Sequence, residues 1–394
     1  MNLLVDGVFF QVADTGIARV WRALLPRLAA FPEFDITVLD RGRCPLISGI
    51  TYVDFPSHTF TSTAADSLLI QEFAEKYKAD VFVSTYFTTP TRVPTVLIVH
   101  DMIPEVFDFD LSQRGWQEKE TAICFAQYYL CVSNNTRRDL LRLYPEISPE
   151  RVSVAHCGVD SDVFYERSRQ DILRFRDKYE IAENYCILVG SREQIHGYKN
   201  AGLLFEALKE EGRTPGGSSI ESFPALQILC VGGEPEIQPH FAAGLRAGIT
   251  AKRLELSDDE LACAYSGARA LVYPSLYEGF GLPVVEAMSC GCPVITTPHG
   301  SLEEVAGDAA LFVSGRDPAE LIDALRVVGN PSNQVSLKER GIEHASRFDW
   351  DRMAEELRQL IHKAEGERAS PAMAGFFGEW DRLRRIQADV DASL

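Results

Sequence analysis

The stretch YEGFGLPVVEAMSCGCPVI, residues 277–295, contains two glutamates eight positions apart, Glu278 and Glu286. A Gly-Phe-Gly-Leu-Pro run separates them, and neither a surface helix nor a buried core segment requires that combination of kink and carboxylates. Along one straight helix the two residues would lie about 12 Å apart. The kink instead predicts that Glu278 lies in a loop and that Glu286 projects from the first turn of a helix. We therefore expect both carboxylates to line one pocket.

The residues around the two glutamates are typical of a phosphate site. The preceding run ARALVYPS (268–275) is predicted to be a strand, and its carboxyl end delivers Glu278 to the edge where open α/β sheets bind ligands. Glycines in the loop allow a ligand to approach the backbone closely. Pro283 favours a helix that begins at Leu282 or Pro283. The free N–H groups of that helix start would attract an anion such as phosphate.

The carboxylates themselves are suited to another part of the ligand. Like charges repel, so Glu278 and Glu286 are not expected to contact the phosphate. A carboxylate can accept two hydrogen bonds from vicinal hydroxyls, as the acidic residue of dinucleotide-binding folds does with ribose. Two such acids beside a diphosphate site predict a nucleotide sugar as the ligand. The alternative is that they are two solvated surface glutamates on either side of a turn.

Short apolar runs alternate with longer amphipathic stretches along the chain, which indicates α/β domains with buried parallel sheets. The expected strands are residues 2–6, 35–39, 50–54, 80–84, 95–99, 129–133, 152–155, 185–190, 226–231, 270–273, 293–296 and 310–313. The expected helices are residues 16–30, 65–77, 112–127, 135–144, 199–210, 258–267, 283–290, 318–328, 335–346 and 350–364, and the charged stretch SRQDILRFRDKY (168–179) is expected to form a further helix.

The chain has 394 residues, which is long for a single hydrophobic core, so we expect two domains. The predicted domains are Rossmann-like and cover residues 1–167 and 168–365. A charged helical tail, residues 366–394, contains aromatic residues that need a packing partner, and we expect it to fold back on the first domain. Residues 213–223 are rich in Gly, Ser and Pro and are expected to form an exposed loop.

The composition excludes several classes of protein. A net charge of −18, with neither half of the chain basic, argues against nucleic acid as a partner. No apolar run is long enough to span a membrane. Arg137, Arg138 and Arg142 allow at most a weak peripheral contact with lipid headgroups, and a solvated helix face is the alternative.

The first residues and the cysteines suggest where the protein works. The N-terminal stretch MNLLVD has no basic region and reaches an acidic residue at once, so it is not expected to be a signal peptide. The nine cysteines include no Cys-x-x-Cys and lie mostly in apolar strand-like runs. Cys290 and Cys292 could form a redox pair, but the single intervening glycine is poor spacing for one. We therefore expect reduced thiols and a cytoplasmic location.

Taken in order, the motifs resemble those of the retaining glycosyltransferases of family 4. The stretch YPSLYEGFGLPVVEAMSCGCPVITTPHGSLEEVAGDAALFV (273–313) is similar to the glutamate-x7-glutamate signature of that family. Weaker matches occur at DTGIARV (14–20), VHDMIPE (99–105), VSNNTRRDL (132–140), HCGVD (156–160), LVGSREQIHGYKN (188–200) and FDWDRMAEEL (348–357). The resemblance implies the GT-B fold, in which two Rossmann-like domains with parallel sheets face each other across a cleft. The first domain would bind the acceptor and the second the nucleotide sugar.

The resemblance also implies roles for the residues of the signature. Glu286 would bind the ribose diol of the nucleotide, and Glu278 the hydroxyls of the transferred sugar. The backbone between them would lie against the sugar and the diphosphate, through Gly279, Phe280, Gly281 and Leu282.

Four residues outside the signature are assigned by the same resemblance. Lys199 would neutralise the diphosphate, with Arg192 as its basic companion. The EQIHGY segment between these two residues is longer than usual in the family. Arg192 could therefore cap a local turn instead. Gly16 matches a glycine-rich loop that approaches the donor phosphates or the acceptor, and this chain has Thr15 where many family members have a second glycine. His100 would hydrogen-bond the transferred sugar near the reacting carbon.

The resemblance implies transfer of a hexose-type sugar, with mannose or a deoxyhexose favoured, from a nucleotide diphosphate sugar to the hydroxyl of a glycan or lipid-linked acceptor. The process served would be cell-surface polysaccharide assembly. No cofactor or metal is expected, because the Asp-x-Asp pairs at 108–110 and 389–391 do not follow strands. Three alternatives remain: a GT-B nucleotide-sugar epimerase, a dehydrogenase and a degenerate scaffold without activity. A dehydrogenase is disfavoured because no Gly-x-Gly-x-x-Gly follows either first strand.

Overall fold

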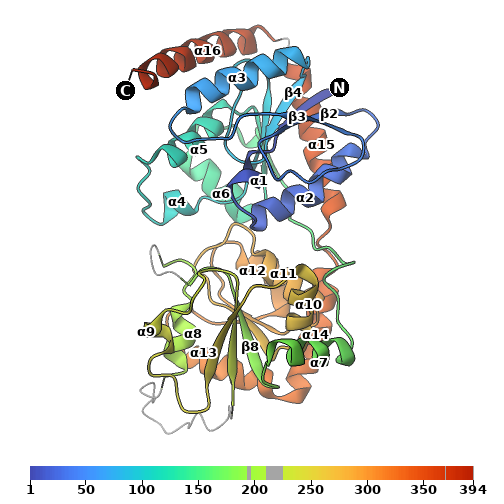
Figure 1. Ribbon diagram of the computed structural model, residues 1–394, viewed down its shortest axis with the longest axis vertical. Coiled ribbons are helices and arrows are strands. Elements are labelled where there is room, and N and C mark those ends of the chain that lie inside the picture. The colour runs from blue at the N-terminus through green and yellow to red at the C-terminus, as the bar shows by residue number, and fades with distance from the viewer. Residues whose placement is uncertain (193–196, 210–224, 369, 394) are drawn as a thin grey trace. The chain divides into compact units, whose positions relative to one another are not determined.

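The computed structural model describes residues 1–192, 197–209, 225–368 and 370–393 (Figure 1). The chain divides into two compact units: unit 1 comprises residues 1–157 and 350–394, and unit 2 comprises residues 158–349. The chain therefore passes from one unit to the other after residues 157 and 349, whereas the sequence predicted boundaries after residues 167 and 365. The segment after residue 157 belongs to unit 2 because Ser289 donates to the carbonyl oxygen of Phe164 (2.6 Å) and Arg167 pairs with Asp259 (2.7 Å).

Unit 1 is built on a seven-stranded parallel sheet with the order β3-β2-β1-β4-β5-β6-β7. Its strands are Asn2–Asp6 (β1), Asp35–Asp40 (β2), Ile50–Asp54 (β3), Val81–Ser84 (β4), Thr95–Val99 (β5), Tyr128–Cys131 (β6) and Val152–Val154 (β7). All seven were predicted within a few residues. The four strands at the centre of the sheet, β1, β4, β5 and β6, are almost entirely buried, as expected of a parallel sheet covered on both faces.

The helices of unit 1 include two short ones that the sequence analysis missed, α1 and α4. Helices of four or five residues are too short to show a 3.6-residue apolar period. The α-helices in the described part of unit 1 are Val8–Val12 (α1), Gly16–Ala29 (α2), Thr63–Lys76 (α3), Ile103–Val106 (α4), Arg114–Phe125 (α5), Asn134–Leu143 (α6), Trp350–Glu367 (α15) and Pro371–Asp391 (α16). Helix α15 packs on α2 and on strands β5 and β6, which is why it belongs to unit 1.

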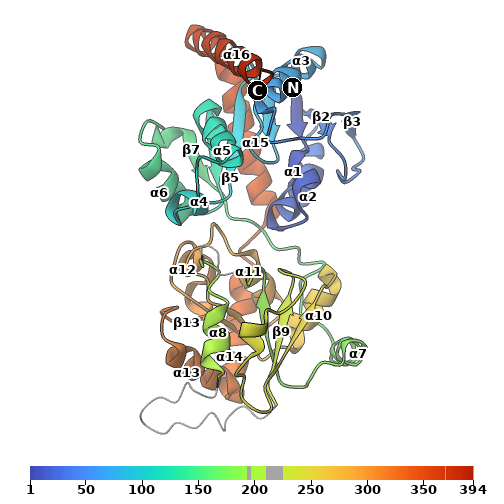
Figure 2. The same ribbon diagram turned by 60° about the vertical axis from the view of Figure 1, so that its left-hand side comes forward.

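The C-terminal helix α16 lies along α3, as both views show (Figure 1, Figure 2). Phe125 at the end of α5 is buried against Met373 and Phe377 of α16. Arg384 of α16 is also buried, and its guanidinium donates to Glu118 of α5 at 2.7 Å. The tail is thus held to unit 1 by an apolar cluster and a buried ion pair.

Unit 2 contains a six-stranded parallel sheet with the order β10-β9-β8-β11-β12-β13. Its strands are Tyr185–Val189 (β8), Gln227–Val231 (β9), Thr250–Leu254 (β10), Ala270–Tyr273 (β11), Val294–Thr296 (β12) and Leu311–Phe312 (β13). The sequence analysis missed β10, because this edge strand buries only its last residue and so lacks an apolar run.

The helices of unit 2 were predicted apart from the short α9 and α12. They are Arg169–Tyr179 (α7), Gly202–Ala207 (α8), Pro239–Ala242 (α9), Asp258–Gly267 (α10), Leu282–Ser289 (α11), Leu302–Ala306 (α12), Pro318–Gly329 (α13) and Pro331–Ala345 (α14). The loop expected at 213–223 lies outside the described residues. No helix in the described part of the chain is long and apolar enough to cross a membrane.

Both sheets have one point at which the winding of the chain reverses. In unit 1 it lies between β1 and β4, and in unit 2 between β8 and β11. Open α/β sheets bind their ligands outside the carboxyl ends of the strands at this switch point. The residues that follow these four strands are therefore the first place to look for a site.

Candidate active site

The stretch with the two glutamates has the predicted strand, loop and helix. Strand β11 ends at Tyr273, Glu278 lies in the loop that follows, and α11 begins at Leu282. Gly281 caps the helix in a left-handed conformation, with φ at +99°, which glycine adopts without strain. Glu286 is the fifth residue of α11, so it projects from the second turn and not from the first as predicted. Both glutamates are buried, with 7% and 2% of their surface exposed.

The loop that carries Glu278 is braced by the segment after β12. The Ser301 hydroxyl lies 3.0 Å from the carbonyl oxygen of Glu278 and 2.8 Å from that of Phe280. At Gly300, where φ is +61°, a Cβ would lie 2.7 Å from the backbone nitrogen of Glu278. The sequence reasoning missed both positions, although they lie in the quoted signature as Gly-Ser after TTPH.

Lys199 and Glu278 form an ion pair at the switch point of unit 2. The ammonium nitrogen of Lys199 lies 2.7 Å from Oε1 of Glu278 and 3.2 Å from the hydroxyl oxygen of Tyr273. Burial alone would lower the pKa of Lys199, but the charge of Glu278 raises that pKa well above its ordinary value of 10.5. Burial also raises the pKa of Tyr273, so its hydroxyl stays protonated. The site therefore presents a charged lysine held between a carboxylate and a phenol.

The segment around Lys199 is docked on the loop after β11. The carbonyl oxygen of Tyr198 accepts from the N–H of Leu276 at 2.7 Å. The Asn200 side-chain amide donates to the carbonyl oxygens of Pro274 (3.1 Å) and Gly315 (2.8 Å). The sequence analysis quoted the YKN motif only for its lysine. The structure adds its asparagine, and Tyr273, as the residues that position that lysine.

Arg192 has a different environment from Lys199. Its buried guanidinium donates to the carbonyl oxygens of Gly232 (2.9 Å) and Glu234 (2.5 Å) and lies 3.6 Å from the carboxylate of Glu234. The backbone N–H of Arg192 donates to that carboxylate as well, at 2.7 Å. These contacts tie together the loops after β8 and β9. They favour the alternative reading of Arg192 as a local structural residue, and its role at the diphosphate stays a prediction.

The two remaining predicted residues, His100 and Gly16, belong to unit 1. His100 directly follows β5 and is partly buried, and burial lowers its pKa to about 4 despite the nearby charge of Asp101. Its imidazole is therefore neutral at pH 7. Gly16 is the exposed first residue of α2, where a glycine-rich loop was expected, and just before it Asp14 pairs with Arg22 at 2.5 Å.

The Asp-x-Asp pairs of the sequence have local partners. Asp110 accepts from the backbone N–H of Ser112 at 3.1 Å, and Asp391 pairs with Arg114 at 2.7 Å. Both contacts are those of surface or packing charges. The expectation that no metal takes part stays a prediction.

Comparisons with known proteins identify the family. The family model described as Glycosyltransferase Family 4 matches residues 15–163, and the model described as Glycosyl transferases group 1 matches residues 183–330. O-antigen chain mannosyltransferase B of Escherichia coli is 27% identical over 365 residues, which cover 86% of this chain and 93% of that protein. O-antigen chain mannosyltransferase RfbU of Salmonella typhimurium is 26% identical over 279 residues, 68% of this chain and 70% of that protein.

Solved structures agree on the fold. WaaG, a glycosyltransferase involved in lipopolysaccharide biosynthesis, superposes with a TM-score of 0.68 at 19% identity, covering 92% of this chain and 99% of that one. Anabaena HepE in complex with UDP-glucose gives a TM-score of 0.68 at 16% identity, covering 92% and 100%. The predicted α/β architecture of GT-B type is therefore confirmed. Because one family model matches each half of the chain, the protein belongs to the family 4 glycosyltransferases, whose second half matches the model for glycosyl transferases group 1.

Proposed function

We propose that this protein is a retaining, metal-independent glycosyltransferase that moves a hexose-type sugar from a nucleoside diphosphate sugar to a hydroxyl of a glycan or lipid-linked acceptor. The observation that carries the proposal is the ion pair of Lys199 and Glu278 at the switch point of unit 2. It joins the partly buried lysine of the YKN motif to the first glutamate of the family signature. Mannose or a deoxyhexose is the favoured sugar, because both O-antigen relatives are named as mannosyltransferases.

The lysine is suited to a diphosphate because its donors are only partly used. An ammonium group has three N–H donors. One is directed at Glu278 and one at Tyr273, so among the described residues the third has no partner and could bind a phosphate oxygen. As the bond to the sugar breaks, the diphosphate gains charge and its hydrogen bond to a charged lysine strengthens. This preference for the transition state is what lowers the barrier.

The two glutamates divide the rest of the donor between them in this proposal. Glu278 is oriented by Lys199 through one oxygen, and its remaining lone pairs can accept from the hydroxyls of the transferred sugar. Glu286, inside α11, would accept from the ribose diol.

The proposed reaction is a front-face displacement. The bond between the anomeric carbon and the phosphate oxygen breaks, and the acceptor oxygen forms its bond on the same face of the sugar. The acceptor's proton passes to the departing phosphate oxygen, so no separate enzymic base is needed. His100, neutral at pH 7, would hydrogen-bond the transferred sugar. The free thiols of all nine cysteines suit a reducing cytoplasmic compartment, where we place the reaction, with cell-surface polysaccharide as its destination.

The first experiment is a thermal-shift panel with UDP, GDP, dTDP and ADP, each with and without EDTA. A nucleotide present at one hundred times its dissociation constant should stabilise the protein by about 2.7 kcal/mol. We expect one base to stand out and the shift to survive chelation. If no nucleotide stabilises the protein, or if the shift requires Mg²⁺ or Mn²⁺, the proposed donor site is wrong.

The second experiment separates the two glutamates. Glu286→Ala should weaken binding of the free nucleoside diphosphate, whereas Glu278→Ala should chiefly lower turnover. Calorimetry with nucleotide alone and steady-state transfer assays measure the two quantities. Equal losses of nucleotide affinity in both variants would contradict the assignment. Turnover of the nucleotide sugar to an epimer in the absence of any acceptor would instead identify an epimerase.

A further inference from the structure

Unit 1 buries a lysine close to the end of β5. Lys119 lies in the middle of α5, and only 2% of its side chain is exposed. Lysine is rarely buried unless its charge is paired, because an uncompensated charge in a protein interior is costly. The contacts of Lys119 therefore indicate why this helix carries a cation on its covered face.

The ammonium group of Lys119 is directed at the turn that follows β5. Its nitrogen lies 2.8 Å from Oε2 of Glu105 and donates to the carbonyl oxygen of Asp101 at 3.0 Å. One carboxylate oxygen of Asp101 lies 3.8 Å away. The ring of Phe87 also lies near the ammonium, with 5.9 Å between the nitrogen and the ring centre. Lys119 thus joins α5 to both ends of the short segment 101–105.

The segment held in this way begins directly after His100. The carboxylate of Asp101 accepts from the backbone N–H of Ile103 at 3.0 Å, where α4 starts. Because Lys119 binds the carbonyl oxygen of the same aspartate, Asp101 is fixed through its side chain and through its backbone. Among the described residues, no group hydrogen-bonds the imidazole of His100 itself. Its position is therefore set by packing and by the backbone, which Lys119 holds one residue away.

The same ammonium acts on His100 through its charge. Burial is the main reason that the pKa of His100 lies at about 4. The negative charge of Asp101 opposes that shift, and the positive charge of Lys119 adds to it. A cation beside a histidine disfavours the protonated imidazole, because like charges repel.

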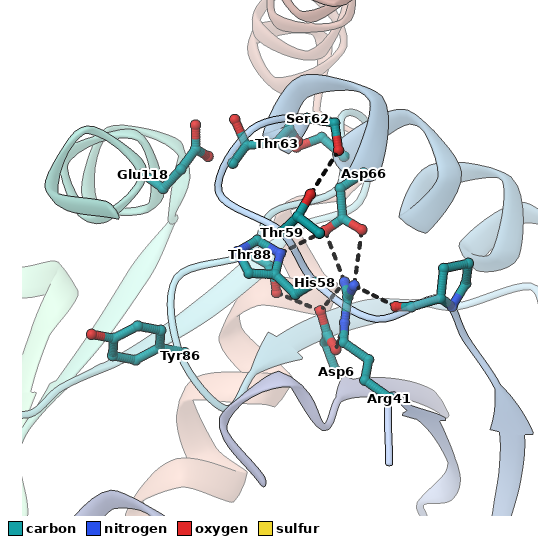
Figure 3. Close-up of polar contacts among 12 residues, drawn as sticks. Asp6, Arg41, His58, Thr59, Ser62, Thr63, Asp66, Tyr86, Thr88 and Glu118 are labelled. Carbon is teal, nitrogen blue, oxygen red and sulfur yellow. Dashed lines mark hydrogen bonds and ion pairs between the residues drawn. The ribbon is translucent and has the colours of Figure 1, made fainter. Parts of the chain in front are cut away.

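Two other ionisable groups of this region do not compete with the lysine. Burial and the charge of Asp101 raise the pKa of Tyr86 to about 12, so its hydroxyl is uncharged at neutral pH. Glu118, the preceding residue of α5, points towards Thr63 (Figure 3) and is paired with Arg384 at 2.7 Å. The two buried charges of α5 are thus neutralised separately, one at the turn after β5 and one by the C-terminal helix.

We propose that Lys119 is a positioning residue of the candidate active site, which clamps the turn after β5 and places a positive charge beside His100. The imidazole is then held in place and uncharged. A neutral imidazole can donate one hydrogen bond and accept another, whereas an imidazolium can only donate. Lys119 acts through His100, since its own ammonium is enclosed by protein groups. The use of His100 in sugar transfer rests on the proposed function, but its protonation can be measured without any substrate.

Three variants separate the charge of Lys119 from the packing of its side chain. Lys119→Met removes the charge and keeps most of the volume, and Lys119→Arg keeps the charge. Arg384→Met is the matched control, because it removes a buried cation from the pair with Glu118 on the same helix. Both methionine substitutions break a buried ion pair and should lower the free energy of unfolding. Only Lys119→Met should change the titration of His100.

The test follows the imidazole signals of the full-length protein by NMR, with isotope-labelled histidine, as the pH is lowered from about 8 to about 5. The signal of His100 is assigned by its absence in His100→Asn. The parent, Lys119→Arg and Arg384→Met should keep this imidazole neutral to the end of the range. In Lys119→Met it should take up its proton at higher pH. An unchanged titration in Lys119→Met, or an equal rise in Arg384→Met, would overturn the inference.

A second variant covers the case in which Lys119→Met does not fold. Lys119→Met combined with Glu105→Gln replaces the whole ion pair by neutral side chains, so no buried carboxylate loses its cation at Glu105. Asp101 remains and the positive charge is gone, so His100 should still take up its proton at higher pH than in the parent. A parental titration in this double variant would overturn the inference as well.

Transfer assays connect the titration to the reaction. Because the proposed function uses a neutral imidazole, the loss of kcat/KM between about pH 7.5 and pH 5 should be at least about twofold larger in Lys119→Met than in the parent. Lys119→Arg should restore the parental pH profile. If the titration of His100 moves but the pH dependence of transfer does not, the role of His100 in the proposed function is wrong, and the effect of Lys119 on its protonation is retained.

Discussion

The two units have the same strand order around their switch points, yet the charged clusters they place there are built around different cations. Unit 1 uses Arg41, whose guanidinium is fully buried and makes two hydrogen bonds to each of two carboxylates. Unit 2 uses Lys199, which contacts one carboxylate and one phenol. The strand order therefore determines where a cluster forms, and the side chain determines what the cluster can do.

The chemistry of the two cations explains the difference. Arginine presents a rigid planar fork that matches a carboxylate in two places, so Arg41 is fixed in its contacts. Lysine is a compact point charge with three equivalent donors, and it can exchange one partner for another. We infer that the unit 1 cluster is a structural frame and that the unit 2 cluster is the one that takes part in a reaction. Five predictions bear on that contrast.

The largest expected effect is on stability, at Arg41. Arg41→Ala leaves the buried carboxylates of Asp6 and Asp66 without the cation that compensates their charge, and breaking such a buried ion pair typically lowers the free energy of unfolding by about 3–5 kcal/mol. Chemical denaturation of the variant measures the loss. Arg22→Ala is the control, because its pair with Asp14 is exposed and should contribute about 0.2–1 kcal/mol. Similar losses in both variants would show that the unit 1 cluster is not a frame.

The next effect is on turnover, at Lys199. Lys199→Ala should reduce the transfer rate by about 10²–10³, the usual effect of losing one preorganised donor at a developing negative charge. Lys199→Arg should restore activity only in part, since a planar fork does not fit where a compact ammonium lay. Steady-state kinetics with saturating donor gives both values.

Arg192→Ala serves as the comparison for Lys199. Its guanidinium satisfies buried carbonyl oxygens, so its removal should lower stability by about 1–3 kcal/mol and should affect turnover less than Lys199→Ala. If Arg192→Ala proves to be the slower enzyme while remaining folded, the arginine reaches the diphosphate after all. The contrast between a structural arginine and a reactive lysine would then fail within unit 2.

A smaller effect concerns pH and His100. The folded protein holds the pKa of His100 at about 4, below its ordinary value of 6.5, because burial disfavours the charged imidazole. As the pH falls, His100 therefore takes up a proton in the unfolded chain before it does so in the folded protein. The stability contributed by the neutral imidazole is complete above pH 6.5. It is lost as the pH falls from 6.5 to 4. Relative to His100→Asn, the parent should lose about 3 kcal/mol over that interval. Parallel stability curves for the two proteins would show that folding does not lower the pKa of His100.

The smallest effect is expected at Tyr273. Tyr273→Phe removes the hydroxyl that lies 3.2 Å from the ammonium of Lys199 but keeps the ring in the core. One hydrogen bond contributes about 0.5–1.5 kcal/mol, so kcat should fall by roughly threefold to tenfold while the affinity for free nucleotide changes little. A loss as large as that of Lys199→Ala would make the tyrosine a direct participant and not a positioning residue.

The sequence alone was sufficient for much of unit 2's site and for most of the fold. Continuous apolar runs marked twelve of the thirteen strands that the structure describes, and Gly281 with Pro283 marked the start of α11. These signals are local, since burial, backbone conformation and the missing N–H of proline act within a few residues. The edge strand β10 and the helices α1, α4, α9 and α12 were missed because they are too short or too exposed to produce such a pattern.

What the sequence determined by itself is therefore the family, the two parallel sheets, and the loop and helix that carry Glu278 and Glu286. Only the tertiary structure decided that residues 350–367 belong to unit 1, that Tyr273 contacts Lys199, and that Lys119 contacts the turn after β5. Those features depend on contacts between distant residues, such as Arg384 with Glu118, 266 positions apart. A single sequence records each residue of such a pair, but the distance between them is set by how the sheets and helices pack.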